Sequence, residues 1–235
     1  MDLTHSYEST VPVDVRARYE FRETRNAAAI LSATNPRGFS DLVDILRSFS
    51  LLTSDLTTAG GQESALAARL NNAFRARGWR EGQVNTHIKL ALRLMPYRPA
   101  GEREAIEQES EVKNDGYKVD NVLDRVAMDL EWNAKDGNLD RDLAAYRALY
   151  DAGLIDCAVL ITRTMDDLRL LARTVRLDAG MSQADASKML NTTTTTNLTK
   201  LLPRMQRGDS GGCPLLAVAI CERTWESYTS APDTP

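Results

Sequence analysis

The hydrophobic positions repeat at helix spacing in the first part of the chain. From Leu42 to Phe49 apolar residues recur every three or four positions, which is typical of one buried helix face. The same spacing predicts helices over most of 14–56 and again over 63–77. We therefore expect residues 1–100 to form a mainly helical N-terminal part of the same domain as the rest.

Further along, the pattern changes to strands that alternate with helices. Apolar and polar residues alternate over 126–131, and two nearly continuous apolar runs at 154–162 and 214–221 have the composition of buried strands. Helix spacing predicts one helix over 139–152 and another over 166–176. A strand, a helix and a strand in succession favour a parallel βαβ unit. The predicted fold is α/β, with a mixed central β-sheet flanked by helices.

Two carboxylates interrupt the first of these strands. A strand repeats every two residues, so Asp129 and Glu131 leave the same face side by side. Asp120 lies an odd number of residues before Asp129, so a bend or an adjacent strand must bring it to the pair. Burying such acids is costly unless a cation or a proton neutralises them, and an all-oxygen set suits Mg²⁺. The alternative is that the two acids form the solvated face of an antiparallel strand.

Composition indicates an ordinary globular chain. At 235 residues, 43% hydrophobic and 26% charged, it has room for one sizeable core. No apolar run is long enough to span a bilayer, and the first residues have neither a basic nor an apolar stretch, so we expect a cytoplasmic protein without a membrane partner. Cys157, Cys213 and Cys221 are unclustered and predicted to be buried free thiols.

The charges are segregated along the chain. The net charge is −4, but residues 102–142 hold thirteen acidic and six basic side chains, whereas 188–207 holds four basic and no acidic ones. We expect the acidic part of this block at 102–113 to be helical, with Glu104, Glu107 and Glu111 solvated. The basic block is either a DNA-binding arm or a solvated helix face.

The segment 181–204 admits a second interpretation, as a helix-turn-helix of a non-catalytic DNA-binding regulator. Ser182 would cap the first helix, Asn191 would make the turn, and the recognition helix would begin near Thr193. Five consecutive threonines are poor helix formers, which argues against it.

Several segments of the chain resemble a known family of nucleases. Residues 119–136, 155–163 and 212–220 are similar to type II restriction endonucleases of the BglII and BstYI group, within the PD…(D/E)xK nuclease superfamily. In that family an Asp is followed nine residues later by an acid, and then by a third polar group after one further residue. Here those positions are Asp120, Asp129 and Glu131. Val119 replaces the superfamily's Pro, and Glu131 replaces its usual Lys.

The resemblance implies a restriction-endonuclease-like fold, with a nuclease core at 101–225 that contains a DNA-contacting segment at 181–210. Residues 226–235 are expected to be a flexible tail. In the implied mechanism the three acids of the motif bind Mg²⁺ and carry the catalysis, and Lys135 is a substitute for the missing motif lysine. The expected reaction is Mg²⁺-dependent hydrolysis of both strands of a short palindromic double-stranded DNA site.

On the nuclease interpretation, hydroxyl, amide and basic side chains of the late segment contact DNA. The candidates are Asn191, Thr193, Thr194, Thr195, Thr196, Asn197, Lys200, Arg204 and Arg207. Cleavage of both strands of a palindrome favours a homodimer. The family resemblance further suggests a GATC-like centre of the site and a cognate DNA methyltransferase that acts on the same sequence.

Overall fold

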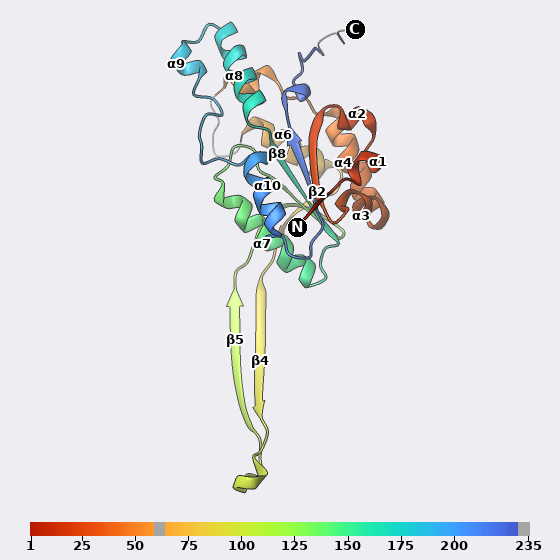
Figure 1. The fold of residues 1–235 in the computed structure, drawn as a ribbon, viewed down its shortest axis with the longest axis vertical. Helices are drawn as coiled ribbons and strands as arrows, with labels where there is room; N and C mark the ends of the chain where they lie inside the picture. Colours follow the sequence, from red (N-terminus) through yellow and green to blue (C-terminus); the bar gives the residue numbers. More distant parts are fainter. Residues whose placement is uncertain (59–63, 230–235) are drawn as a thin grey trace. The chain divides into compact units, whose positions relative to one another are not determined.

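The computed structural model describes residues 1–58 and 64–229, and these form two units (Figure 1). The larger unit combines residues 1–81 with the chain from 119 onward, and the smaller one is 82–118. Gly60 and Gly61, between the two stretches predicted to be helical, and the end of the predicted tail, from residue 230, lie outside the described residues.

A seven-stranded mixed sheet forms the centre of the larger unit. Its order is β1-β2-β9-β8-β7-β6-β3. The strands are β1 (Leu3–Thr4), β2 (Tyr19–Thr24), β3 (Arg80–Gln83), β6 (Lys118–Leu123), β7 (Val126–Leu130), β8 (Cys157–Arg163) and β9 (Leu215–Ile220). β7, β8 and β9 run parallel, whereas β6 and β2 pair antiparallel with β7 and β9. Both late apolar runs are therefore interior strands, as predicted, and the mixed sheet is confirmed.

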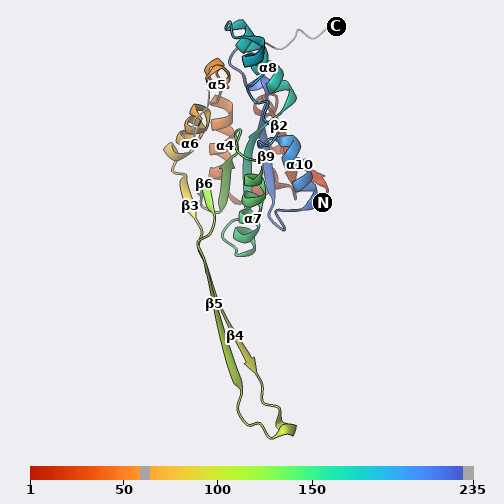
Figure 2. The same ribbon diagram turned by 90° about the vertical axis from the view of Figure 1, so that its left-hand side faces the viewer.

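Helices cover both faces of this sheet. They are α1 (Tyr7–Thr10), α2 (Val13–Arg16), α3 (Ala27–Thr34), α4 (Pro36–Ser48), α5 (Thr53–Thr57), α6 (Ala65–Ala76), α7 (Gly137–Asp151), α8 (Asp166–Asp178), α9 (Gln183–Ala186) and α10 (Leu198–Arg207). Figure 2 shows α4 and α6 on one side of the sheet, and α7 and α10 on the other. None of the described helices is long and apolar enough to cross a bilayer.

Successive side chains of β7 point to opposite faces of the sheet. Val126, Met128 and Leu130 join the large apolar cluster that also contains the buried residues of α3, α4 and α6. The alternate positions, including Asp129, face α7, whose Tyr146 contacts Asp129. The helix that completes the predicted βαβ unit therefore covers the face from which the carboxylates project.

Two helical predictions are wrong. Residues 19–24 lie inside the expected helical stretch 14–56 but form β2, which pairs with β1 and β9 and buries Tyr19 and Phe21. Residues 106–114, which overlap the predicted acidic helix 102–113, form the strand β5. In both segments apolar and polar residues alternate, so they occupy opposite faces of a strand. Pairing with neighbouring strands therefore outweighed the local helix propensity.

The smaller unit is a long antiparallel hairpin. β4 (Thr86–Leu94) pairs with β5 (Ile106–Asn114) in continuous register, from Thr86 opposite Asn114 to Leu94 opposite Ile106. The connection contains the predicted proline loop and the short 3₁₀ turn η1 (Arg98–Ala100). Alternating aliphatic residues along β4 explain the strand, because this pattern places all of them on one face.

The three cysteines are free thiols and buried, as predicted from their apolar surroundings. Burial raises the pKa of the Cys157 and Cys221 thiols to about 12 and about 11. The thiols therefore stay protonated and unreactive in the folded protein.

Candidate active site

The antiparallel pair β6–β7 brings Asp120 to Asp129. The register places Asn121 opposite Met128, so the next pair toward the start of β6 is formed by the two aspartates. The backbone N–H of Asp120 donates to Oδ1 of Asp129 at 2.8 Å, and the N–H of Leu130 donates to Oδ2 of Asp120 at 3.1 Å. The adjacent strand thus supplies the third carboxylate, one of the two ways in which the sequence allowed it.

Glu131 follows β7 directly and is 4% exposed. Its backbone is fixed by three neighbours: its N–H donates to the Ile161 carbonyl, and its own carbonyl accepts from the Thr162 and Thr196 hydroxyls. Its carboxylate is far less constrained, because Oε1 accepts a weak hydrogen bond of 3.4 Å from Asn138. Oε2 is buried without a hydrogen-bond partner among the described residues.

Helix α7 contributes two site residues that the sequence analysis did not identify. The Asp142 side chain is 1% exposed, and its Oδ2 is a second buried oxygen that finds no partner in the described part of the chain. One turn later, the Tyr146 hydroxyl donates to Oδ2 of Asp129 at 2.7 Å and also lies 3.2 Å from the Val159 carbonyl. A signal was present: Asp142 lies at helix spacing between Leu139 and Tyr146, on the apolar face of its helix.

Burial raises the pKa of every carboxyl in this cluster, which consists of Asp120, Asp129, Glu131 and Asp142. Desolvation is the largest cause for each of them. It acts together with the nearby Asp142 charge to raise the pKa of Asp129 to about 7 and that of Glu131 to about 9. The carboxyls of Glu131 and Asp142 also influence each other directly, and this interaction raises the pKa of Glu131 further.

Among the described residues, Arg141 is a cation that forms ion pairs with acids of this cluster. Its guanidinium contacts Oδ1 of Asp142 at 2.9 Å and approaches Oε1 of Glu131 at 3.8 Å. The Arg141 side chain is half exposed. One partly solvated guanidinium cannot compensate the three buried carboxyls and the partly buried one of Asp120 when they are ionised.

The chemistry of the cluster fits a hard divalent cation. Its donors are carboxylate oxygens, and two of them are buried and unbonded. In the side-chain positions observed, the described residues contain no group of three or more His, Cys, Asp or Glu side chains arranged to hold one ion. One oxygen of the Asp120 carboxylate and one of the Asp129 carboxylate instead accept backbone N–H groups of the paired strands.

Residues 19–220 match the family model described as "Restriction endonuclease BglII/BglIII". No protein in the curated collection matches the chain. The match covers most of the 235 residues.

This chain belongs to the BglII restriction endonuclease family. It is therefore a type II restriction endonuclease, a site-specific deoxyribonuclease that binds double-stranded DNA and hydrolyses it. The matched region contains the whole acid cluster.

Family membership and the fold together remove the helix-turn-helix interpretation. α9 is a single turn from Gln183 to Ala186, although Ser182 caps it as predicted. Residues 192–197 are not helical, and the following helix, α10, begins at Leu198 rather than near Thr193. The five threonines instead form an irregular segment that lies against the chain just after β7, through hydrogen bonds between Asp136 and Thr194 and between Thr196 and Ala134.

The predicted DNA-contacting residues separate into two groups. Asn191, Thr193 and Thr194 are exposed. Thr195, Thr196 and Asn197 are buried, and their side chains hydrogen-bond within the protein to Arg163, to Glu131 and to the first turn of α10, respectively. These three side chains hold the irregular segment in place, close to the end of β7.

The predicted basic residues of α10 take part in ion pairs. Lys200 contacts Asp136 at 2.9 Å, Arg204 binds both oxygens of Asp140, and Arg207 pairs with Asp209. Their positive charge is therefore partly neutralised by the acids at the start of α7 and after α10. Lys135 is exposed, and its backbone forms an isolated bridge with Thr195.

Proposed function

We propose that this endonuclease is a Mg²⁺-dependent homodimer that cuts both strands of a short palindromic DNA site. The single observation that carries the metal requirement is the acid cluster with its two unbonded buried oxygens. Three buried carboxyls and the partly buried one of Asp120, with two oxygens that find no partner among the described residues, gain most from a divalent cation.

In this proposal Asp120 and Asp129 hold the cation from the paired strands β6 and β7. Bound there, a divalent ion stabilises negative charge on the phosphate and lowers the pKa of a coordinated water. Glu131 positions the attacking water and accepts its proton on the free Oε2. Tyr146 keeps the Asp129 carboxylate oriented through its 2.7 Å hydrogen bond.

Asp142 extends the site on the helix side. Its carboxyl interacts with that of Glu131 and has a buried oxygen without a partner among the described residues, so Asp142 becomes either a further cation ligand or the group that fixes Glu131. Lys135 is the candidate for a positive charge near the scissile phosphate, since it is exposed and follows the strand of the acids by a few residues. These roles replace that of the motif lysine, which Glu131 cannot perform because a carboxylate carries no positive charge.

The exposed residues of the irregular segment are proposed to contact DNA. Asn191 lines a hollow of about 290 Å³ together with Arg169 and Arg173. Guanidinium groups bind phosphate oxygens, and amides read base edges or phosphates. Thr193 and Thr194 are the other exposed candidates of this segment.

The palindromic site follows from a two-fold symmetric enzyme, in which each subunit cuts one strand. We further propose, from the family resemblance, a GATC-like centre and protection of the same sequence by a cognate methyltransferase. Sequencing the ends of the DNA fragments gives the recognition sequence and the cut position together.

The test is cleavage of plasmid DNA. We expect discrete fragments with Mg²⁺ and none with EDTA, and we expect Asp129→Asn to reduce cleavage by about 10³-fold or more while binding to DNA in Ca²⁺ persists. Asp124→Asn is the matched control, because Asp124 is an exposed residue on the turn between β6 and β7 and should cut normally. An Asp129→Asn enzyme with normal activity would show that the wrong acids are assigned.

A further inference from the structure

The β4–β5 hairpin, residues 86–114, has one strongly apolar face. Every second residue of β4 is a large aliphatic one, and the register adds two more from β5. All six are 45–59% exposed: Ile88, Leu90, Leu92, Leu94, Ile106 and Val112. Ser110 and Gln108, opposite Leu90 and Leu92, complete this face.

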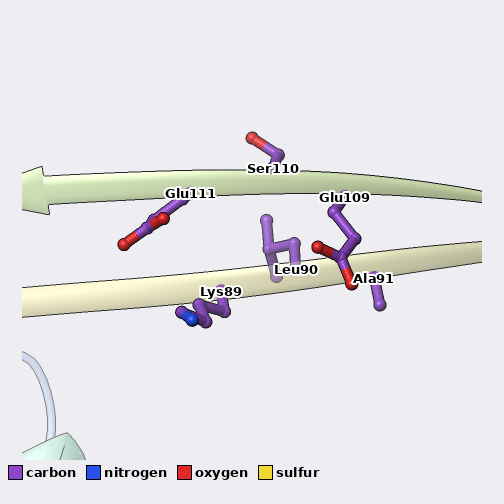
Figure 3. A pocket seen from close by; sticks show the side chains of 6 residues that line it. All are labelled: Lys89, Leu90, Ala91, Glu109, Ser110 and Glu111. Atoms are coloured by element: carbon purple, nitrogen blue, oxygen red, sulfur yellow. The ribbon is translucent and has the colours of Figure 1, made fainter.

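The other face of the hairpin is polar. The basic residues of β4 stand opposite glutamates of β5, with Lys89 paired to Glu111 and Arg93 to Glu107. Figure 3 shows Lys89 and Glu111 on one side of the hairpin and Leu90 and Ser110 on the other. Charges of opposite sign face each other across the strands, so this face is stable in water.

An isolated two-stranded hairpin is marginally stable in water, and a contiguous apolar patch on a soluble protein marks an interaction site. The chain nevertheless keeps nine paired residues in each strand. The aliphatic face therefore needs a partner that removes it from water.

The charges indicate that this partner is a protein surface rather than DNA. The exposed glutamates of β5 stand opposite the basic residues of β4, so the polar face is balanced and offers DNA phosphates no excess of positive charge. The apolar face itself carries no charged side chain at positions 86 to 94 of β4 or 106 to 112 of β5. An uncharged aliphatic face matches another uncharged aliphatic face.

A second copy of the same hairpin meets this requirement. We propose that two subunits pack their hairpins face to face about a two-fold axis, with β4 lying antiparallel across the partner's β4. This arrangement places Leu90 against Leu92 of the partner subunit. It also places Ile88 against the partner's Leu94 and Val112 against the partner's Ile106, so that aliphatic side chains meet aliphatic ones throughout. Ser110 then lies opposite the partner's Gln108, where hydroxyl and amide groups can hydrogen-bond.

Edge-to-edge pairing under the same symmetry is disfavoured by charge. A two-fold axis that joined β5 to the partner's β5 would bring the Glu107, Glu109 and Glu111 rows together, and β4 joined to β4 would bring Lys89 and Arg93 close to the same residues of the second copy. Face-to-face packing keeps all of these charges in solvent.

The area is sufficient for a specific contact. Each copy contributes six aliphatic side chains that are about half exposed. Together the two copies remove on the order of 1,000 Å² of apolar surface from water, which reaches the size of specific protein interfaces. This inference deepens the proposed homodimer by assigning a surface to it, and it rests on that proposal.

The first experiment measures the dimer dissociation constant by sedimentation equilibrium of the full chain without DNA or metal. We expect the double variant Leu90→Gln/Leu92→Gln to weaken dimerisation at least about 100-fold. The matched control, Lys89→Gln/Arg93→Gln, introduces the same residue type at neighbouring positions on the polar face and should change the constant less than about threefold.

Disulfide trapping provides a second measurement that does not depend on weakened folding. Under mild oxidation, Leu90→Cys/Leu92→Cys should form covalent dimers at high yield, whereas Ala91→Cys on the polar face should not; the three native thiols are buried. A monomeric wild-type chain, an apolar-face variant that dimerises as tightly as the wild type, or equal trapping by Ala91→Cys would each overturn the assignment.

The outcomes separate this inference from the proposed function. If the apolar-face variants stay dimeric and cut plasmid normally, the dimer uses another surface and the nuclease proposal stands. If they unfold more easily without any change in association, the face is covered by the subunit's own chain and the assignment fails. If the wild type is dimeric through the hairpin but does not cut with Mg²⁺, the nuclease proposal fails instead.

Discussion

The acid cluster and the hairpin both depart from the usual distribution of side chains, in which charged groups are exposed and apolar groups are buried. In the acid cluster, three carboxyls are buried and that of Asp120 is partly buried. In the hairpin, six large aliphatic side chains are left in water. Each arrangement is costly for the chain alone, and each becomes favourable when a complementary partner is added.

The difference lies in what completes each region. The acid cluster has a rigid frame, because β6, β7 and α7 fix the backbone of every acid and hydrogen bonds fix two of the carboxylates. The acid cluster is therefore completed by a small cation. The hairpin has a polar face that is already balanced and an apolar face that is not, so it needs a large uncharged surface.

After Asp129, the largest effect on cleavage is expected at Asp142. If this residue belongs to the acid cluster, Asp142→Asn should lower cleavage about 10²- to 10³-fold and weaken Mn²⁺ binding measured by calorimetry. It should also stabilise the metal-free protein against heat, because it removes a buried charge that raises the pKa of Glu131 and Asp129.

Asp151→Asn is the control for this substitution, since Asp151 lies on the same helix and forms a long surface ion pair of 3.7 Å with Arg147. A destabilised Asp142→Asn protein with normal metal binding would mean that Asp142 only anchors Arg141.

A pair of leucine substitutions compares burial in the two regions directly. Leu160→Ala in β8, where the side chain is fully buried, should lower the free energy of unfolding by about 2–5 kcal/mol. Leu92→Ala in the hairpin should lower it by less than about 1 kcal/mol when measured at concentrations where the protein is monomeric. Urea denaturation gives both values, and equal losses would show that the hairpin face is buried within one subunit.

The pH dependence of stability tests the charges of the acid cluster. Asp129 has an ordinary pKa of 3.8 and a folded-state pKa of about 7, so the folded metal-free protein binds its proton more tightly than the unfolded chain. This contribution to stability is present at low pH and is lost as the pH rises from about 4 through 7, by on the order of a few kcal/mol.

Thermal unfolding of wild type and Asp129→Asn across this pH range isolates the effect, because the substitution removes it. Added Mg²⁺ should raise the melting temperature more at pH 8 than at pH 5, since a cation binds the ionised carboxylates. Equal stabilisation at both pH values would argue against metal binding by this cluster.

The smallest effect is expected from Tyr146→Phe, which removes the hydroxyl that orients Asp129 and keeps the ring. We expect kcat to fall about tenfold with little change in the affinity for DNA. The cost in stability should be about 1 kcal/mol, which melting curves measure. Unchanged kcat together with that loss would make the hydroxyl a purely structural group.

Local patterns determined much of this protein. Alternation over 126–131 predicted a strand, and the apolar runs that became β8 and β9 predicted buried strands, because strands buried on both faces have few residue choices. The residue spacing that resembles the nuclease motif selected Asp120, Asp129 and Glu131, and the sequence required either a bend or an adjacent strand to bring the first to the others.

Tertiary structure decided the rest. The sequence could not show that Asp142 and Tyr146 approach β7, because the packing angle of α7 on the sheet sets which helix residues meet which strand residues. It also gave the acidic stretch before Asn114 a helical interpretation, whereas pairing with β4 made it a strand. Both the packing of α7 on β7 and the pairing of β5 with β4 depend on contacts between residues far apart in the sequence. A short stretch of sequence does not contain the free energies of these contacts.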